Sequence, residues 1–390
     1  MLALLALGGC GPIQTDAPGA SAVGSDGLGE VSAVVIQENL EVPWDVDFTP
    51  DGRMLVTERA GRINLYASAE PGAEKLVTLE IPDVRAEGEA GAMGIAVDID
   101  FERYPHAYVC VSRDKDGADG DAPWRTALLR LNIDDDELVL DPEPLVDGIY
   151  AAVHHNGCAV QMDDSGHIWM STGDANTVRG VHFSQRLDSL NGKILRMDRD
   201  GSVPADNPVL PGADGPKLIY SMGHRNPQGI AMGPEGLVLA PEHGTDHDDE
   251  INRIVPGGNF GYGCFLGTDV IGPALEQEGE AKELCGELDE YLPSSWSSGP
   301  STIATSGAIF LEGDDWGAWQ GMLMVSTLKE SDLRLFAVED GGATVREVRV
   351  LLDGEHGRLR GLARGPDGAI YVTTSNASSD QVLRLMRDDG

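Results

Sequence analysis

The fold is decided by a unit that is clearest in residues 159–172, AVQMDDSGHIWMST. Two short apolar stretches flank the turn Asp163-Asp164-Ser165-Gly166, and a third stretch, Ile194-Leu195-Arg196-Met197, follows downstream. Short apolar runs bounded by Gly and Asp are typical of β-strands. This part of the chain therefore predicts a hairpin followed by a third strand.

The unit occurs six times along the chain. Its first two strands span residues 46–57, 95–112, 159–172, 230–240, 307–326 and 361–374. Repeats that contain only strands are typical of propeller blades. Amphipathic helix patterns of more than about three turns are not evident in the sequence. We therefore predict an all-β protein that forms a six-bladed β-propeller.

The composition disfavours two classes of partner. The 390 residues include 28 Lys and Arg against 65 Asp and Glu, which gives a formal net charge of −37. A chain this acidic repels nucleic acid and anionic membrane surfaces. The acidic residues are dispersed and form no Asp-x-Asp-x-Asp-Gly loop, so they fit a solvated surface better than a series of calcium-binding repeats.

The N-terminus predicts export. Residues 1–10 are small and apolar and end in Leu7-Gly8-Gly9-Cys10, as in a bacterial lipoprotein signal, although the positively charged start of such a signal is missing. The alternative is a disordered apolar end with a chance cysteine. We expect a flexible tether over 11–37, a propeller domain over 38–390, and a periplasmic or outer-membrane lipoprotein that contacts the membrane only through a lipid on Cys10.

Four further cysteines remain, and their even number fits an oxidising compartment. Cys264 and Cys285 flank a Gly- and Glu-rich insertion, and we favour a disulfide between them. Cys110 and Cys158 lie in neighbouring predicted blades, where they either form a second disulfide or remain buried thiols. The sequence contains no Cys-x-x-Cys motif, which argues against zinc and c-type haem.

The repeat also predicts where a site lies. If the first strand of each unit is innermost, the residues before it and those after the second strand meet at one mouth of the central channel. Those places hold an unusual share of the basic residues and several histidines: Pro43-Trp44, Glu89, His154-His155-Asn156, His224-Arg225-Asn226, Arg358-Leu359-Arg360, Asp174, Glu242-His243-Gly244 and Lys329. Loops on a rigid scaffold commonly carry function.

These motifs resemble the soluble pyrroloquinoline quinone dehydrogenases of the glucose/sorbosone dehydrogenase family, which include aldose sugar dehydrogenases. The resemblance covers roughly residues 38–386. It depends on the joint occurrence, in order, of Gly88-Glu89-Ala90-Gly91, His155-Asn156-Gly157, Thr172-Gly173-Asp174, Gly223-His224-Arg225-Asn226-Pro227-Gln228-Gly229, Glu242-His243-Gly244, Asp249-Glu250, Leu328-Lys329 and Arg358-Leu359-Arg360.

The resemblance implies two cofactors, pyrroloquinoline quinone and Ca²⁺. The quinone carries three carboxylates, so a buried site requires fixed cations. The positions that match the family's cofactor contacts are Glu89, Arg225, Asn226, Gln228, Lys329, Arg358 and Arg360. The main-chain oxygens of Gly244 and Thr245 match ligands of the Ca²⁺ on the quinone, and Glu250 is a candidate ligand of a structural Ca²⁺.

The resemblance also implies a reaction, the oxidation of an aldose or related polyol by hydride transfer to the quinone. His155 matches the general base, Asp174 would orient its ring, and Arg225 would stabilise charge that develops on the quinone. Taken alone, His155 is more often a turn histidine, and Arg358 and Arg360 could simply form salt bridges. The sugar and the electron acceptor are not evident from the sequence.

The sequence departs from the family pattern at three places, and two other classes of function remain possible. Cys158-Ala159-Val160 follows Gly157 where the family usually has another Gly, Thr245 stands where Pro is common, and segment 265–300 matches nothing in the family. The alternatives are a catalytically silent binding propeller and a calcium-dependent lactone or ester hydrolase. Such a hydrolase needs acidic and amide side chains around an axial metal, whereas the mouth predicted here is cationic.

Overall fold

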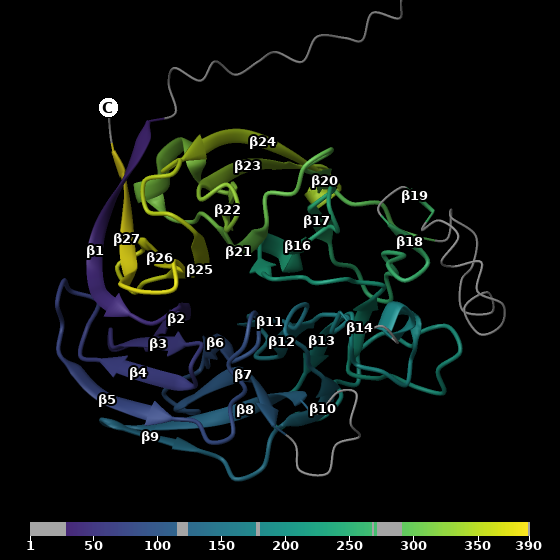
Figure 1. Cartoon of the computed structure of the whole chain (residues 1–390), viewed down its shortest axis with the longest axis horizontal. Coiled ribbons are helices and arrows are strands. Elements are labelled where there is room, and N and C mark those ends of the chain that lie inside the picture. The colour runs from purple at the N-terminus through teal and green to yellow at the C-terminus, as the bar shows by residue number, and fades with distance from the viewer. Residues whose placement is uncertain (1–28, 115–123, 177–179, 267–268, 271–290, 389–390) are drawn as a thin grey trace, which may run out of the picture.

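The chain folds as an all-β, six-bladed propeller in the computed structural model (Figure 1), which confirms the predicted architecture. The structure describes residues 29–114, 124–176, 180–266, 269–270 and 291–388. Each of six sheets begins with a strand that lines the centre, and its first three strands follow the chain outward. Each predicted unit, a hairpin followed by a third strand, therefore forms the three inner strands of one blade.

The two inner strands of each blade pair antiparallel. From the first blade to the sixth, the innermost strands are β2 (Pro43–Phe48), β6 (Ala92–Val97), β11 (Gly157–Met162), β15 (Ala231–Met232), β21 (Thr305–Phe310) and β25 (Leu359–Arg364). Their partners are β3 (Met54–Glu58), β7 (His106–Asp114), β12 (Ile168–Thr172), β16 (Val238–Glu242), β22 (Leu323–Thr327) and β26 (Ile370–Thr374).

The outer strands complete the sheets. The third strands are β4 (Arg62–Tyr66), β8 (Trp124–Asp134), β13 (Lys193–Met197), β17 (Glu250–Arg253), β23 (Leu333–Glu339) and β27 (Asp380–Asp388). The outermost strands are β5 (Lys75–Glu80), β9 (Glu137–Leu140) with β10 (Val146–Tyr150), β14 (Ile219–Met222), β20 (Trp296–Ser297), β24 (Thr344–Leu351) and β1 (Glu30–Leu40). The remaining elements are the hairpin β18 (Phe265–Leu266) with β19 (Asp269–Val270) and the 3₁₀ turns η2 (Gly180–Gln185), η3 (Pro234–Gly236), η6 (Asp314–Trp319) and η7 (Asp340–Gly342).

The propeller is closed by its N-terminal strand. β1 pairs antiparallel with β27, so the first described strand forms the outer edge of the last blade (Figure 1). The predicted tether over 11–37 is therefore wrong for residues 30–37, which lie in β1. The sequence Glu30–Leu40 alternates too weakly to be recognised as a strand without its partner. The rest of the predicted tether and the predicted signal lie outside the described residues.

A hydrophobic cluster fills each boundary between neighbouring blades. Leu55 of the first blade packs with Ile95 of the second, for example, and Met324 of the fifth packs with Leu359 of the sixth. The ring is closed by a cluster that joins Val46 of the first blade to Tyr371 of the sixth. Because each fully buried aliphatic or aromatic side chain contributes about 1.5–3 kcal/mol, these six interfaces hold the blades as one rigid disc.

The inner hairpins share an irregularity at one mouth of the channel. In the first, second, third, fifth and sixth blades, the pairing register shifts directly after the first residue of the innermost strand. Such bulges bend a strand and redirect its side chains, and they commonly lie beside active sites. The mouth with these bulges is the one that the sequence predicted to carry the site.

Candidate active site

A histidine–aspartate pair lies at this mouth on the third blade. His155 precedes β11 and Asp174 follows β12, so the hairpin brings their side chains together. The Nδ1 atom of His155 lies 2.7 Å from Oδ1 of Asp174, and both residues are buried. A carboxylate on Nδ1 holds the imidazole ring and leaves Nε2 as the nitrogen that can accept a proton.

The turn that carries His155 is tightly packed against the start of the Asp174 loop. A Cβ atom on Gly173 would lie 2.1 Å from the carbonyl oxygen of His155, so only glycine allows this approach. The same carbonyl accepts a hydrogen bond from the Ala175 main-chain nitrogen at 2.9 Å. His155 itself has a φ angle of 62°, in the left-handed region that is costly for a residue with a side chain.

Glu89 connects His155 to the neighbouring blades. Its Oε2 atom accepts hydrogen bonds from the main-chain nitrogen of His155 at 2.9 Å, from Asn226 Nδ2 at 3.1 Å and from Gln228 Nε2 at 3.2 Å. Burial raises the pKa of Glu89, but His243, the His155 main-chain N–H and Arg360 together outweigh this effect and lower the pKa. Glu89 therefore acts as an anionic centre of the network, and its direct contact with a cofactor remains a prediction.

Arg360 is a buried cation that forms no salt bridge in the described part of the chain, although Glu89 attracts it electrostatically. It is 4% exposed, its guanidinium lies 3.7 Å from the centre of the Trp44 ring, and its Nη1 donates to Gln228 Oε1 at 3.1 Å. Burial lowers the pKa of Arg360 to about 9. A buried cation held by neutral groups is costly unless an anion joins it, so this position favours an anionic ligand.

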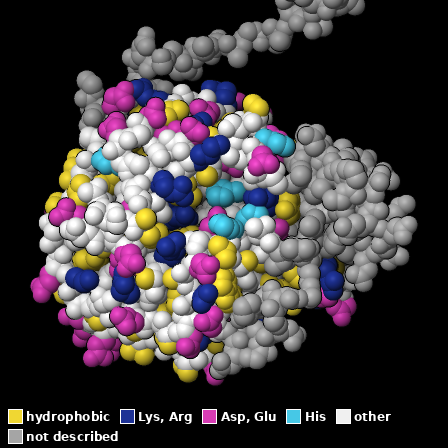
Figure 2. All heavy atoms as spheres, in the orientation of Figure 1, with side chains coloured by type: hydrophobic (Ala, Val, Ile, Leu, Met, Phe, Trp, Pro, Cys, Tyr) yellow, Lys and Arg dark blue, Asp and Glu magenta, His cyan; other side chains and the backbone are white. Residues whose placement is uncertain are grey.

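The three other predicted cations at this mouth also form no salt bridge in the described residues, although Lys329 and Arg358 are exposed and Arg225 is half-buried. Lys329 Nζ donates to the Thr302 carbonyl at 2.8 Å, Arg225 Nη1 donates to the His243 carbonyl at 3.1 Å, and the Arg358 side chain reaches only the Leu328 carbonyl. Within the described part of the chain, none of these four cations lies within 4.0 Å of a carboxylate. Figure 2 shows Lys, Arg and His side chains gathered at the centre of this face.

A small cavity adjoins these cations on the fourth blade. It has a volume of about 30 Å³, and its lining includes Gly244, Thr245, Glu242, Glu250 and Arg225. The pKa of Glu250 is raised to about 8, first by burial and then by the nearby Glu242 carboxylate. Two close carboxylates with main-chain oxygens beside them are a suitable donor set for a hard divalent cation.

The predicted metal residues therefore lie together, but they do not form a side-chain cage. Over the described ranges, no group of three or more His, Cys, Asp and Glu side chains is arranged as metal ligands. Asp249 is engaged by the backbone, since its Oδ1 accepts from Gly244 N at 2.7 Å and its Oδ2 accepts from Ile303 N at 2.6 Å. A Ca²⁺ ion at this cavity would depend on main-chain oxygens together with Glu250 or Glu242.

Three of the buried polar side-chain atoms that lack a hydrogen-bond partner in the described structure lie in or near this site. Arg225 Nε, Thr305 Oγ1 and Asn252 Oδ1 are buried side-chain atoms without a hydrogen-bond partner. Arg225 lines the small cavity, His243 Nε2 hydrogen-bonds to the Thr305 carbonyl at 2.7 Å, and Asn252 Nδ2 donates to Glu250. Because buried polar groups are almost always paired, these atoms fit a site for an anionic cofactor and a cation.

Two residues of the site were not predicted from the sequence. Tyr262 follows the glycine-rich stretch Gly257–Gly261, and its hydroxyl donates to Asp174 Oδ2 at 3.2 Å. The sequence placed Trp44 at this mouth without a role, and in the structure the Arg360 guanidinium lies over its ring. Position was the available signal for both, since each lies beside a motif already assigned to this mouth.

The structure also decides between the two states proposed for one cysteine pair. Cys110 and Cys158 form a disulfide between the second and third blades, with 5.7 Å between their Cα atoms. Cys264 is disulfide-bonded as well, and its predicted partner Cys285 lies outside the described residues, as does most of segment 265–300.

No helix in the described part of the chain is long and apolar enough to cross a membrane.

Comparison with known proteins identifies the family of this chain. Residues 40–385 match the family model "Glucose / Sorbosone dehydrogenase". The chain belongs to the glucose/sorbosone dehydrogenase family. This finding confirms the resemblance inferred from the motifs, and the match covers the complete propeller apart from most of β1 and the end of β27.

Three relatives illustrate the membership. The chain is 31% identical to aldose sugar dehydrogenase YliI of Escherichia coli, with 90% of this chain and 91% of that protein aligned. It is 27% identical to quinoprotein glucose dehydrogenase B of Acinetobacter calcoaceticus, over 91% and 87% of the two chains. The solved PQQ-bound aldose sugar dehydrogenase of Streptomyces coelicolor superposes with a TM-score of 0.71 at 26% identity, over 92% and 99% of the chains.

Proposed function

We propose that this protein is a pyrroloquinoline quinone- and calcium-dependent dehydrogenase that oxidises an aldose or related polyol. The observation that carries the proposal is the set of four cations without carboxylate partners at one mouth of a chain with a net charge of −37. Family membership supports the reaction class, and the PQQ-bound relative supports the identity of the anionic ligand.

The cofactor is assigned to the residues that require an anion. Arg358, Arg360 and Lys329 would bind its carboxylates, while Arg225 and Asn226 would contact the quinone side. When bound, pyrroloquinoline quinone supplies the two-electron oxidising group that no side chain can provide. The cavity at Gly244 and Thr245 would hold the Ca²⁺ of the cofactor next to Arg225, while Glu250, which also lines it, stays a candidate ligand of a structural Ca²⁺.

His155 is assigned the proton transfer. Its Nε2 would take the proton of the sugar hydroxyl as the neighbouring C–H bond is oxidised, and Asp174 on Nδ1 would stabilise the resulting imidazolium. Glu89 accepts a hydrogen bond from the main-chain nitrogen of His155 and so restrains the turn that carries the imidazole ring. Binding and proton transfer thus belong to different blades.

Export is part of the proposal. The Cys110–Cys158 disulfide fits an oxidising compartment such as the periplasm. Attachment of a lipid to Cys10 stays a prediction, because that residue lies outside the described part of the chain. A Cys10→Ser variant expressed with a complete bacterial leader should be released from the membrane fraction as active enzyme.

Reconstitution tests the function. Purified apoprotein receives the quinone and Ca²⁺, and reduction of an artificial dye is followed with a panel of aldoses and polyols; matched samples receive the quinone alone or Ca²⁺ alone. We expect turnover only with both additions. Quinone binding without oxidation of any sugar would indicate the silent propeller, and lactone hydrolysis with Ca²⁺ alone would indicate the hydrolase.

A further inference from the structure

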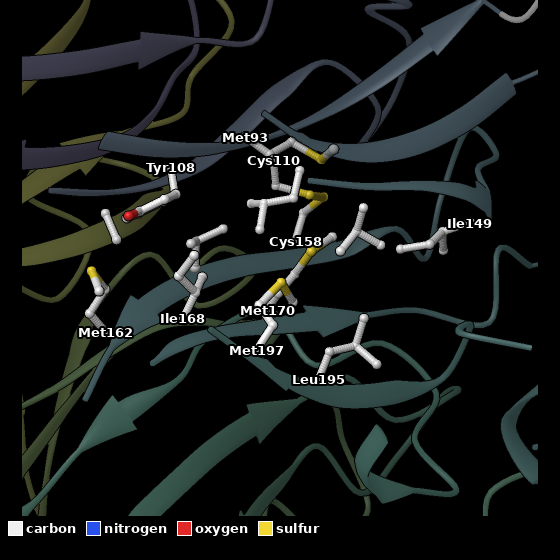
Figure 3. Packing of buried hydrophobic residues seen from close by; sticks show 14 of the residues in the cluster. Met93, Tyr108, Cys110, Ile149, Cys158, Met162, Ile168, Met170, Leu195 and Met197 are labelled. Carbon is white, nitrogen blue, oxygen red and sulfur yellow. A yellow bond between two sulfur atoms is a disulfide. The ribbon is translucent and has the colours of Figure 1, made fainter. Parts of the chain in front are cut away.

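The Cys110–Cys158 disulfide lies directly beneath the turn that carries His155. Cys110 is in the middle of β7, and Cys158 is the second residue of β11, three positions after His155. Both cysteines are completely buried in the cluster between the second and third blades (Figure 3), with Met93 and Met170 nearby. The disulfide therefore ties the first residues of the base-bearing strand to the neighbouring blade.

The backbone at Cys158 is unusual among the inner strands. In four of the blades, two residues of the innermost strand form the bulge, and Cys158 with Ala159 occupies this place in the third blade. The residues equivalent to Cys158 in the second, fifth and sixth blades are Met93, Ser306 and Arg360, and none of them has a positive φ angle. Cys158 has a φ angle of 75°.

Left-handed backbone is concentrated in this short turn. His155 has a φ angle of 62° and Gly157 one of 66°, so three of four consecutive residues are left-handed. Such a conformation costs about 1–3 kcal/mol for each residue with a side chain, and it persists only where its surroundings enforce it. Glycine would carry no such cost at position 158, and a cysteine therefore requires a restraint.

The neighbouring blade leaves little space for an alternative path. A Cβ atom on Gly94 of β6 would lie 2.3 Å from the carbonyl oxygen of Cys158, so the two backbones are in close contact. On the other side, Gly157 N donates to Asn226 Oδ1 at 3.0 Å. If Cys158 adopted a negative φ angle, its carbonyl or its amide group would have to move. Movement of the amide would shift Gly157 and Asn156 and therefore the main chain of His155.

We propose that the Cys110–Cys158 disulfide is a positioning element for His155. It holds Cys158 in the left-handed conformation that the turn requires and thereby fixes the direction in which the imidazole points. This inference rests on the proposed role of His155. It assigns a function to the departure at Cys158, where the sequence differs from the Gly expected from its relatives.

Two single variants that both remove the disulfide separate positioning from stability. Cys110→Ala leaves a left-handed residue with a side chain at position 158, whereas Cys158→Gly removes the conformational cost together with the bond. We expect kcat to fall about tenfold in Cys110→Ala and to stay within about threefold of wild type in Cys158→Gly, because small displacements of a base are costly. Both measurements are made well below the unfolding temperature of each variant.

A second readout does not depend on activity. In the apoprotein, the proton on Nδ1 of His155 is observed by ¹H–¹⁵N NMR, with His155→Ala to assign the signal. The signal of the Asp174-bound ring should be shifted or broadened in Cys110→Ala and retained in Cys158→Gly. Quinone affinity should remain within about threefold in both variants, because its cationic contacts lie on other blades.

The outcomes are distinguishable. The proposal is overturned if Cys110→Ala keeps wild-type kcat and the wild-type His155 signal, or if Cys158→Gly loses as much of both as Cys110→Ala. If wild type oxidises no sugar with both cofactors, the proposed function fails, while the NMR comparison still shows whether the disulfide positions the ring.

Discussion

The two mouths of the central channel use the same residue types in opposite ways. At the far mouth, Arg364 lies against Glu312 at 2.6 Å, and Arg199 lies against Asp98 at 2.7 Å. At the near mouth, Arg360 is the second residue of the strand that ends at Arg364, yet it has only neutral hydrogen-bond partners in the described structure. The two arginines of the far mouth thus have carboxylate partners, whereas Arg360 at the near mouth has none within 4.0 Å in the described part of the chain.

This contrast distinguishes structural arginines from ligand-binding ones. Asp and Glu outnumber Lys and Arg by 65 to 28, so this chain has more than enough carboxylates to pair with its cations. Keeping a guanidinium buried without a carboxylate costs stability, and a fold tolerates such a cost mainly where function requires it. Among the described residues, the buried Lys193 also has no carboxylate within 4.0 Å, but three main-chain carbonyls hold it, whereas Arg360 has only Gln228 and Ser375 as hydrogen-bond partners.

The largest effect is expected when the His155–Asp174 pair is disrupted, with the His167–Asp163 pair of the far mouth as the control. His155→Ala should reduce turnover about 10²–10⁴-fold, the usual contribution of a general base, with nearly unchanged quinone and Ca²⁺ affinity. His167 is the matched control, because its Nδ1 lies 3.1 Å from Asp163 Oδ2 at the far mouth. His167→Ala should keep turnover within about threefold. Equal turnover in His155→Ala and wild type would remove the base from this mouth.

The next effect concerns the two arginines of β25. Arg360→Ala should weaken quinone binding by about 2–5 kcal/mol, as expected when one partner of a buried charge pair is lost. Arg364→Ala should leave binding unchanged and lower only stability, since its partners Glu312 and the Phe310 carbonyl are structural. Binding is measured by titration with Ca²⁺ present. Equal affinities in the two variants would contradict the assignment of the anion to the near mouth.

The fold and much of the site could be predicted because both depend on local patterns. Hairpins repeat with recognisable turns, and each blade places its strand ends at the same mouth, so His155 and Asp174 could be brought together from sequence alone. The closing role of Glu30–Leu40 could not be predicted, since that strand is defined by a partner about 350 residues away. The same holds for the Cys110–Cys158 bond and for Tyr262, whose contacts are between blades.

A smaller effect is expected inside the channel, between the mouths. Asp45 lies beside Arg360 and Gln228, and burial raises the pKa of Asp45 to about 8. Between about pH 4 and pH 8 the folded state keeps a proton that the unfolded state has released. The free energy of unfolding should therefore fall as the pH rises through this window, by up to about 1.4 kcal/mol per unit for this group.

Asp45→Asn should make that pH dependence shallower. Some slope should remain, because Asp47 and Glu250 are also buried acids with pKa values raised to about 6 and about 8. Denaturant unfolding of the apoprotein at pH 5, 6 and 7 measures the difference. A variant with the slope of wild type would show that Asp45 is ionised in the folded channel throughout this range.

The smallest effect is expected from two tyrosine–aspartate contacts. Tyr262 donates its hydroxyl hydrogen to Asp174 Oδ2 at 3.2 Å, and Tyr108 donates to Asp98 Oδ2 at 2.9 Å near the far mouth. Removing one such hydrogen bond costs about 1 kcal/mol. In Tyr262→Phe the loss should appear in kcat, about fivefold, because Asp174 is held less firmly against His155. In Tyr108→Phe the same loss should appear in the free energy of unfolding while kcat is unchanged. If Tyr262→Phe lowers the free energy of unfolding and leaves kcat unchanged, the Tyr262 contact has only a structural role, like that of Tyr108. Asp174 would then be held against His155 by the Asn176 main-chain nitrogen, which donates to its Oδ1 at 2.9 Å.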